Sequence, residues 1–216
     1  MHPNPNFRNV ADAASLRFAQ MRSFGVISVN GSVGPVMAHL PFLLSDDSKI
    51  ADMHLVRSNE IAGLLNQPLP ATLVVSGPDG YVSPDWYGVE DQVPTWNYVA
   101  VHLRGHLEAL PDEDLRDILE RQSEAYEART QGKPPWTLGK LTDETYARMA
   151  RMIRPARLHI ERIESTWKLS QNKGVSARLA ASEQLQNGFG HELRSLGEMM
   201  RNPPEQVDIC PTRSYI

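Results

Sequence analysis

The chain has 216 residues, a formal net charge of −4 at pH 7, and 41% hydrophobic and 22% charged residues. This length predicts one large domain, or one domain with appended helices, and it is ample for a hydrophobic core. The slightly acidic balance excludes a strongly basic nucleic-acid-binding protein, and no apolar run is long enough for a helix that spans a bilayer.

The two ends of the sequence contain few signals. The N-terminal stretch MHPNPNFRNVADAA has no basic start followed by an apolar block, so we expect no secretory signal. Cys210 is the single cysteine, which excludes an intrachain disulfide, and we expect it to be a tail residue without a role. Together these features predict a cytoplasmic protein.

The first half of the chain has the pattern of one helix followed by strands. Asn9 can cap a helix in which Ala14, Phe18 and Met21 lie on one face. Short β-prone segments, separated by turn sequences, follow at residues 24–30, 35–44, 49–56 and 71–77. Residues 98–109 alternate most regularly, with a predicted buried face of Val99, Val101, Leu103, Leu107 and Ala109. The opposite, polar face consists of Tyr98, His102, Arg104, His106 and Glu108.

Helices interrupt the strands in the second half. Pro111 opens a helix whose inner stripe is Leu115, Ile118, Leu119, Gln122 and Tyr126. Thr142 starts another helix, with Tyr146, Met149 and Ile153 as its apolar stripe. Residues 157–165 return to a strand, and residues 176–200 are helical except for NGFG at 187–190.

This order of elements predicts an α+β fold, namely a small antiparallel barrel with helices packed on it. Strands and helices do not alternate along the chain, which argues against a doubly wound parallel sheet. We expect a barrel domain with inserted helices over residues 1–175, followed by a C-terminal helical segment and tail over 176–216.

Several common catalytic and metal-binding motifs do not occur in the sequence. It contains no GxGxxG, no Walker A loop and no GxSxG elbow. His102 and His106 share a strand face, but that spacing separates them by roughly 13 Å, too far for one ion. We therefore predict no catalytic residue and no metal ligand.

Arg57, Ser58 and Asn59 follow a predicted strand and precede a short helical segment. A guanidinium, a hydroxyl and the N–H groups of a helix start are good donors for a phosphate. The alternative interpretation is an ordinary helix cap made by Ser58 or Asn59.

Aromatic residues gather in two loop-like stretches and near the last predicted strand. GPDGYVSPDWYG at 77–88 and VPTWNYVAVH at 93–102 contain Trp and Tyr, which favour places with one apolar and one wet side. Near the last strand, Trp167 and Lys168 are adjacent, as expected for a cover over a flat anionic ligand or for an ordinary strand end. The aromatic stretches indicate a ligand site or a subunit interface.

Five stretches, in this order, resemble the PaiB family, whose members are described as FMN-binding negative transcriptional regulators. They are AHLPF (38–42), HLVRSN (54–59), GPDGYVSPDWYG (77–88), VPTWNYVAVHLRG (93–105) and TWKLSQNK (166–173). VPTWNY and WKLSQN are the most specific of them. The family belongs to the FMN-binding split-barrel group, with pyridoxamine phosphate oxidases and small flavin reductases. The resemblance implies a six-stranded antiparallel barrel and a homodimer with FMN at the subunit interface.

The resemblance also implies a set of FMN-binding residues. Arg57 and Ser58, extended by Asn59, match the phosphate site; His39 and Leu40 match the strand along the isoalloxazine ring; Trp167 and Lys168 match an element that crosses from the partner subunit. Glu60 departs from the family pattern and places a negative charge beside the predicted phosphate site. The full predicted set is His39, Leu40, Arg57, Ser58, Asn59, Trp96, Asn97, Tyr98, Trp167, Lys168 and Gln171.

Two functions from different classes follow. The resemblance implies a negative transcriptional regulator, for which the best DNA-contacting face in the sequence is Arg148, Arg151 and Arg154, with Arg157 beyond them. The alternative is an FMN-dependent oxidoreductase or flavin reductase without direct DNA binding, because hydride chemistry belongs to the cofactor and needs few side chains. A dimeric binding module that has lost FMN is a third interpretation.

Overall fold

The structure, a computed structural model, describes residues 1–205. Cys210 and the end of the predicted tail lie outside the described residues. The chain forms two compact units: unit 1 combines residues 1–18, 76–101 and the chain from 164 onward, and unit 2 combines 19–75 and 102–163. The stretch from 176 onward, predicted as a separate C-terminal segment, thus groups with other parts of the chain in unit 1.

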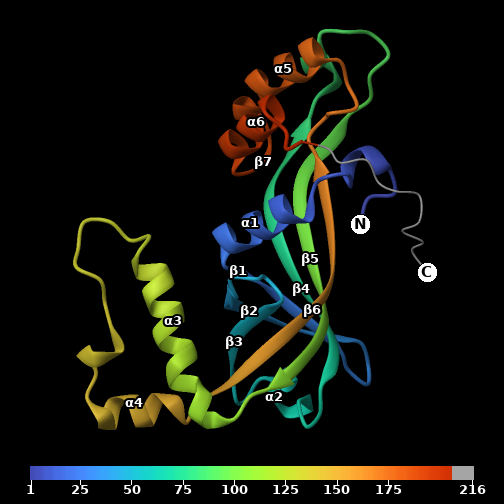
Figure 1. The fold of residues 1–216 in the computed structure, drawn as a ribbon. Coiled ribbons are helices and arrows are strands. Elements are labelled where there is room, and N and C mark those ends of the chain that lie inside the picture. Colours follow the sequence, from blue (N-terminus) through green and yellow to red (C-terminus); the bar gives the residue numbers. More distant parts are fainter. Residues whose placement is uncertain (206–216) are drawn as a thin grey trace. The chain divides into compact units, whose positions relative to one another are not determined.

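A single antiparallel sheet contains all the strands of the described residues (Figure 1). Its order is β1-β2-β3-β6-β5-β4-β7, and β1 also pairs with β4, which closes the first six strands into a barrel. The strands are β1 (Phe24–Asn30), β2 (Pro35–Leu44), β3 (Ile50–Val56), β4 (Leu69–Val82), β5 (Thr95–Ala109), β6 (Ile153–Lys168) and β7 (Gly190–His191). The predicted antiparallel barrel with helices is confirmed, and β4, β5 and β6 are longer than predicted.

Barrel closure in unit 2 brings backbones close together at two glycines. A Cβ on Gly25 of β1 would lie 2.6 Å from the carbonyl oxygen of Val74 on β4. A Cβ on Gly105 of β5 would lie 1.7 Å from the carbonyl oxygen of His159 on β6. No side chain fits at either position, so glycine is required where neighbouring strands approach this closely.

The barrel core consists of the inward-facing residues, which are every second residue along each strand. On β2 the buried residues are Ala38, Leu40, Phe42 and Leu44, which follow the period of two expected for a strand. On β5 the predicted inner face is confirmed for Val99, Val101, Leu103 and Leu107, whereas Ala109 at the strand end is only half-buried. Complete burial of a Leu or Phe side chain contributes roughly 1.5–3 kcal/mol, so these inward-facing residues stabilise the barrel.

Unit 2 also contains the helices α2 (Glu60–Leu64), η3 (Asp112–Asp114), α3 (Leu115–Glu127), η4 (Leu138–Lys140) and α4 (Asp143–Ala150), of which α2 and α3 pack on the barrel strands β2 and β3. Helix α3 packs on β2 and β3 through Leu115, Ile118 and Gln122, which are buried as predicted. Tyr126 donates a hydrogen bond of 2.8 Å to the carbonyl oxygen of Phe42, and burial raises the pKa of Tyr126 to about 12.

Two of the helix faces that the sequence predicted to be buried each contain an exposed residue. Met149 on α4 is 55% exposed, and α4 has no buried residue. Met21 on α1 (Asp12–Arg22) is 66% exposed, although Phe18 on the same helix is buried. A period of 3–4 residues predicts which side chains share a face, but only packing decides whether that face meets the core.

A buried carboxylate joins α3 to two strands of unit 2. Asp52 on β3 is 1% exposed, accepts hydrogen bonds of 2.7 and 3.0 Å from Arg157 on β6, and accepts one of 2.7 Å from Arg121 on α3. Burial alone would raise the pKa of Asp52, but the hydrogen bonds from Arg157 and Arg121 outweigh it and hold the pKa below its ordinary value. The folded state therefore favours the ionised carboxylate.

Unit 1 consists of the ends of β4, β5 and β6 with β7 and most of the helices near the chain ends. Its other elements are η1 (Pro5–Phe7), the first part of α1, η2 (Pro84–Tyr87), α5 (Val175–Gln184), η5 (Leu185–Asn187) and α6 (Leu193–Arg201). Helix α5 packs against α6 and η2. The predicted break at 187–190 is confirmed, because η5 and β7 separate the two helices.

Residues 1–205 contain neither a membrane-spanning helix nor a metal-binding cluster of side chains. No helix among residues 1–205 has the length and hydropathy needed to cross a membrane. The same part of the chain holds no group of three or more His, Cys, Asp or Glu residues arranged around a metal position.

We expect Asp52→Asn to lower the free energy of unfolding by about 3 kcal/mol, because it leaves Arg121 and Arg157 beside a neutral group. A group with a depressed folded pKa stabilises the protein above its unfolded pKa of about 3.9, and loses that stabilisation as pH falls. The difference between wild type and Asp52→Asn in urea unfolding should therefore shrink between pH 7 and pH 3. Exposed Asp46, changed to Asn, is the matched control. Equal stability of both variants at pH 7 would contradict this role.

Candidate functional site

The predicted FMN-binding residues fall into two sets, one in each unit. Unit 2 contains His39, Leu40, Arg57, Ser58 and Asn59, and unit 1 contains the rest: Trp96, Asn97, Tyr98, Trp167, Lys168 and Gln171.

In unit 2, the two predicted residues on β2 point their side chains in opposite directions, one outward and one inward. His39 is exposed, and Leu40 is 3% exposed with its side chain in the barrel core. The alternation of the strand enforces this difference. A ligand outside the barrel could therefore contact the side chain of His39 but only the backbone of Leu40.

The strand-to-helix corner after β3 is exposed and holds a cation. Arg57 donates a hydrogen bond of 2.7 Å to Asp112, and both side chains are exposed. Asn59 caps α2, because its side-chain oxygen accepts a hydrogen bond of 2.9 Å from the backbone N–H of Ile61. Ser58 and Glu60 are exposed. The corner thus combines the two interpretations made from the sequence: Asn59 acts as a helix cap, while Arg57 and Ser58 face outward.

In unit 1, Trp96 lies in an exposed cluster of aromatic rings. Its ring packs edge-on against Tyr81, with centroids 6.4 Å apart, and against Phe189, with centroids 5.6 Å apart. Trp96 is 42% exposed and Phe189 is 72% exposed. We call these three residues the aromatic cluster. Large exposed aromatic groups of this kind mark contact surfaces for a ligand or a partner.

Asn97, the residue next to Trp96, is fully buried and belongs to a hydrogen-bond network. Its side-chain nitrogen donates to the hydroxyl of Ser170 at 2.8 Å, and the hydroxyl of Tyr87 lies 2.9 Å from the same Ser170 oxygen. Ser170 has a φ of 59°, a left-handed backbone conformation that the surrounding packing must enforce. Burial raises the pKa of Tyr87, so its hydroxyl remains protonated. The stretches DWYG, VPTWNY and WKLSQN therefore meet inside unit 1.

Trp167, Lys168 and Gln171 are engaged within unit 1. Trp167 is buried against Phe18, with ring centroids 5.4 Å apart, and its indole N–H donates to Ser15 at 3.2 Å. Lys168 donates to the hydroxyl of Thr95 at 2.5 Å, and burial lowers its pKa. The amide of Gln171 accepts from the backbone N–H of Leu169 at 2.7 Å and donates to the carbonyl oxygen of Trp167. Trp167 and Gln171 thus hold the turn after β6 in this chain.

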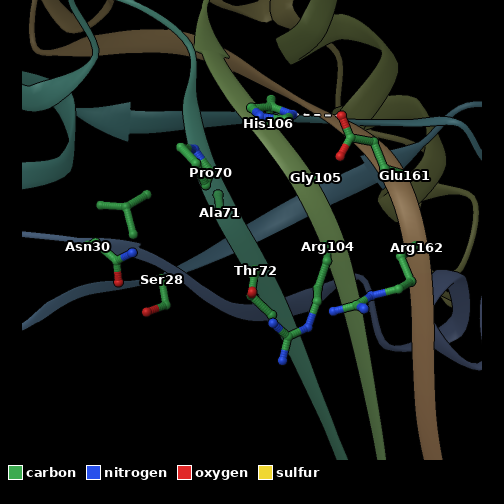
Figure 2. Close-up of a pocket in the computed structure, with 11 residues that line it drawn as sticks. Ser28, Asn30, Pro70, Ala71, Thr72, Arg104, Gly105, His106, Glu161 and Arg162 are labelled. Atoms are coloured by element: carbon green, nitrogen blue, oxygen red, sulfur yellow. Dashed lines mark hydrogen bonds and ion pairs between the residues drawn. The ribbon is translucent and has the colours of Figure 1, made fainter. Parts of the chain in front are cut away.

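Unit 2 contains a groove that the predicted set does not include. It has a volume of about 500 Å³ and is lined by β1, β4, β5 and β6 through Ser28, Val29, Asn30, Pro70, Ala71, Thr72, Arg104, Gly105, His106, Glu161 and Arg162. Figure 2 shows the two arginine side chains at one end of this view and a pair made by His106 and Glu161, 2.6 Å apart, at the other. The polar face predicted for residues 98–109 contained Arg104 and His106, but nothing in one sequence places Arg162 or Thr72 beside them.

Comparison with known proteins identifies the family. A family model described as "Putative FMN-binding domain" matches residues 1–162, which is most of the chain. The chain belongs to this FMN-binding family. The Bacillus subtilis "Protease synthase and sporulation protein PAI 2" is 29% identical over 201 residues, covering 92% of this chain and 96% of that protein. The predicted membership of the PaiB family is confirmed.

Solved structures with the same fold confirm the split-barrel prediction. The FAD and heme binding protein from Mycobacterium smegmatis has a TM-score of 0.56 at 14% identity, covering 85% of this chain and 82% of that one. The flavocytochrome Anf3 from Azotobacter vinelandii has a TM-score of 0.53 at 14% identity, covering 74% of this chain and 69% of that one. At this level of identity the similarity shows the fold.

The family membership supports FMN as the cofactor, and the corner after β3 provides a donor set that fits its phosphate. A guanidinium has five N–H donors in a fixed fork, and Asp112 accepts from one nitrogen of Arg57. Arg57 can therefore still donate to a phosphate beside the hydroxyl of Ser58. Both side chains are exposed and can donate to the same phosphate group.

We expect Ser170→Ala to lower the free energy of unfolding by about 1–3 kcal/mol, because the buried polar groups of Asn97 and Tyr87 lose their shared partner. Urea unfolding followed by tryptophan fluorescence measures this loss. Ser32→Ala, at an exposed position, should change stability by no more than about 0.5 kcal/mol. If the two variants unfold at the same urea concentration, the buried network does not stabilise unit 1.

Proposed function

We propose that this chain is an FMN-binding, homodimeric negative transcriptional regulator of the PaiB type that acts in the cytoplasm. The observation that carries the proposal is the match to PAI 2 along nearly the whole of both chains. That relative is named for protease synthesis and sporulation, which are cellular programmes rather than single reactions. Such a name favours control of gene expression over a metabolic conversion.

In this proposal, the exposed Arg57 and Ser58 hold the phosphate of FMN, while Asn59 fixes the corner as the cap of α2. The side chain of His39 and the backbone of Leu40 lie along the flavin ring. When bound, FMN supplies a ring that can accept and return electrons. The side chains of this chain bind and orient it, and the exposed Glu60 opposes the phosphate by its charge.

The homodimer is supported by the aromatic cluster, which combines the half-exposed Trp96 with the strongly exposed Phe189. A second copy of the chain would cover these rings, as closed two-fold dimers do for large apolar patches. Trp96 is exposed and Trp167 is buried, so Trp96 of the partner subunit is the better candidate to reach the flavin edge. Lys168 is half-buried and donates to Thr95, so it would place a positive charge beside the residue that precedes Trp96.

The proposed DNA-contacting face is narrower than the sequence predicted. Arg148 and Arg151 on and beside α4 are exposed. Arg154 donates to the carbonyl oxygen of Ala62 at 3.0 Å, and Arg157 is held by Asp52. Two exposed arginines per chain remain for phosphate contacts, and a dimer would present four.

An FMN-dependent oxidoreductase or flavin reductase without direct DNA binding is the second candidate. The net charge of −4 favours it, because a negatively charged surface repels DNA at long range. The internal engagement of Arg154 and Arg157 favours it as well, because it removes half of the predicted basic face.

The phosphate site is tested by a flavin-fluorescence titration at one ionic strength. Arg57→Ala should weaken FMN binding roughly tenfold to a hundredfold, since a charge-assisted hydrogen bond contributes about 1.5–3 kcal/mol. Riboflavin, which has no phosphate, should bind wild type and Arg57→Ala equally. Arg17→Ala removes the same charge at an exposed position elsewhere and should leave FMN affinity unchanged. Wild-type FMN affinity in Arg57→Ala would overturn the phosphate assignment.

The regulatory role is tested by DNA binding at physiological salt, measured by fluorescence anisotropy on fragments upstream of the chain's own gene. Changing Arg148 and Arg151 together to Ala should weaken binding about tenfold and flatten the salt dependence, because phosphate contacts are lost. The control, Arg17→Ala with Arg22→Ala, removes two exposed charges from α1. If the wild type binds no fragment more tightly than unrelated DNA, the regulator is excluded and the oxidoreductase candidate is favoured.

A further inference from the structure

We propose that the groove lined by β1, β4, β5 and β6 of unit 2 binds a phosphorylated small molecule other than FMN, with Arg104 and Arg162 as its phosphate ligands. The groove holds about 500 Å³, within the range of small-molecule sites. A phosphate group alone is much smaller, so this volume points to a phosphate attached to an organic part.

The positive charge of the groove comes from neighbouring strands. Arg104 lies on β5 and Arg162 on β6, and these strands are adjacent in the sheet. Two positive charges on neighbouring strands repel each other. An anion bound between them would attract both and offset this repulsion. Both arginines have interactions inside the chain, but a guanidinium carries five N–H donors, so each can also bind an anion.

The negative charge of the groove lies on one side chain that is paired with a histidine. Glu161 is the single carboxylate among the lining residues, and His106 lies 2.6 Å from its oxygen. In Figure 2 this pair lies away from the guanidinium groups. The lining at the arginine end therefore contains two guanidinium groups and no carboxylate, even though the whole chain is acidic.

The neutral donors favour a phosphate over a carboxylate. Ser28 and Asn30 on β1 and Thr72 on β4 add two hydroxyls and an amide to the lining. A carboxylate offers two oxygens, whereas a terminal phosphate offers three and carries up to two charges, so it can use more of these donors. Pro70, which is exposed, adds an apolar ring that an organic part of the ligand can contact.

The close approach of β5 and β6 at Gly105 fixes the spacing between Arg104 and Arg162. Gly105 follows Arg104 directly, and a Cβ there would lie 3.2 Å from the backbone nitrogen of Glu161, next to Arg162. Any side chain at position 105 would push the two strands apart. The spacing of the two guanidinium groups thus depends on a glycine that the barrel already requires.

The experiment is a calorimetric titration of pyrophosphate into protein saturated with FMN, so that the FMN phosphate site is occupied. We expect pyrophosphate to bind, and Arg104→Gln with Arg162→Gln to weaken it at least tenfold. Thr72→Val keeps the charge and the shape and should weaken it about threefold. Malonate, a dicarboxylate, should bind at least tenfold more weakly than pyrophosphate. Arg17→Gln with Arg22→Gln removes two charges elsewhere and should leave pyrophosphate binding unchanged.

Flavin fluorescence in the same samples separates this site from the FMN site. Pyrophosphate should not release FMN, and the double glutamine variant should bind FMN as the wild type does. The proposal is overturned if pyrophosphate does not bind, if the double variant with an unchanged thermal melt binds it normally, or if pyrophosphate displaces FMN. A chain that binds pyrophosphate but no FMN would retain the groove site and contradict the proposed function instead.

Discussion

The pairing of β1 with both β2 and β4 is the constraint on which unit 2 depends. Val26 of β1 faces His39 of β2 on one side and Val74 of β4 on the other, so the strand has no free edge. Closing a six-stranded sheet in this way removes the unpaired edges that invite aggregation. It also requires close backbone contact at Gly25 and Gly105, where a Cβ cannot fit. The corner after β3 and the groove that contains Arg104 and Arg162 both lie on the barrel that this closure fixes.

Unit 1 is held together in a different way, by buried polar contacts between segments that are distant in the sequence. The hydroxyl of Ser170 accepts a hydrogen bond from the side chain of Asn97 and lies beside the hydroxyl of Tyr87. The three residues come from three of the stretches that resemble the PaiB family. Their network is buried, so its polar groups would be costly to leave without partners. Those stretches therefore serve the fold as well as a surface, since Trp96 beside Asn97 points the other way and is exposed.

The sequence predicted what depends on local periodicity. The alternation of residues 98–109 identified the inner face of β5, and Thr142 was correctly placed before α4, where its hydroxyl accepts from the N–H of Thr145. It did not predict contacts that depend on how distant segments meet. Arg104 and Arg162 line one groove, and Arg121 of α3 reaches Asp52 of β3, only because of strand order and helix packing. The resemblance implied that Trp167 covers the flavin, yet packing buries Trp167 and exposes Trp96.

Size-exclusion chromatography with light scattering and flavin absorbance measures at once whether the chain forms a dimer and whether that dimer carries FMN. We expect one peak at twice the chain mass of 24.2 kDa that absorbs in the visible range and releases one FMN per chain on denaturation. A peak at the mass of a single chain at micromolar concentration, without flavin absorbance after incubation with FMN, would contradict it.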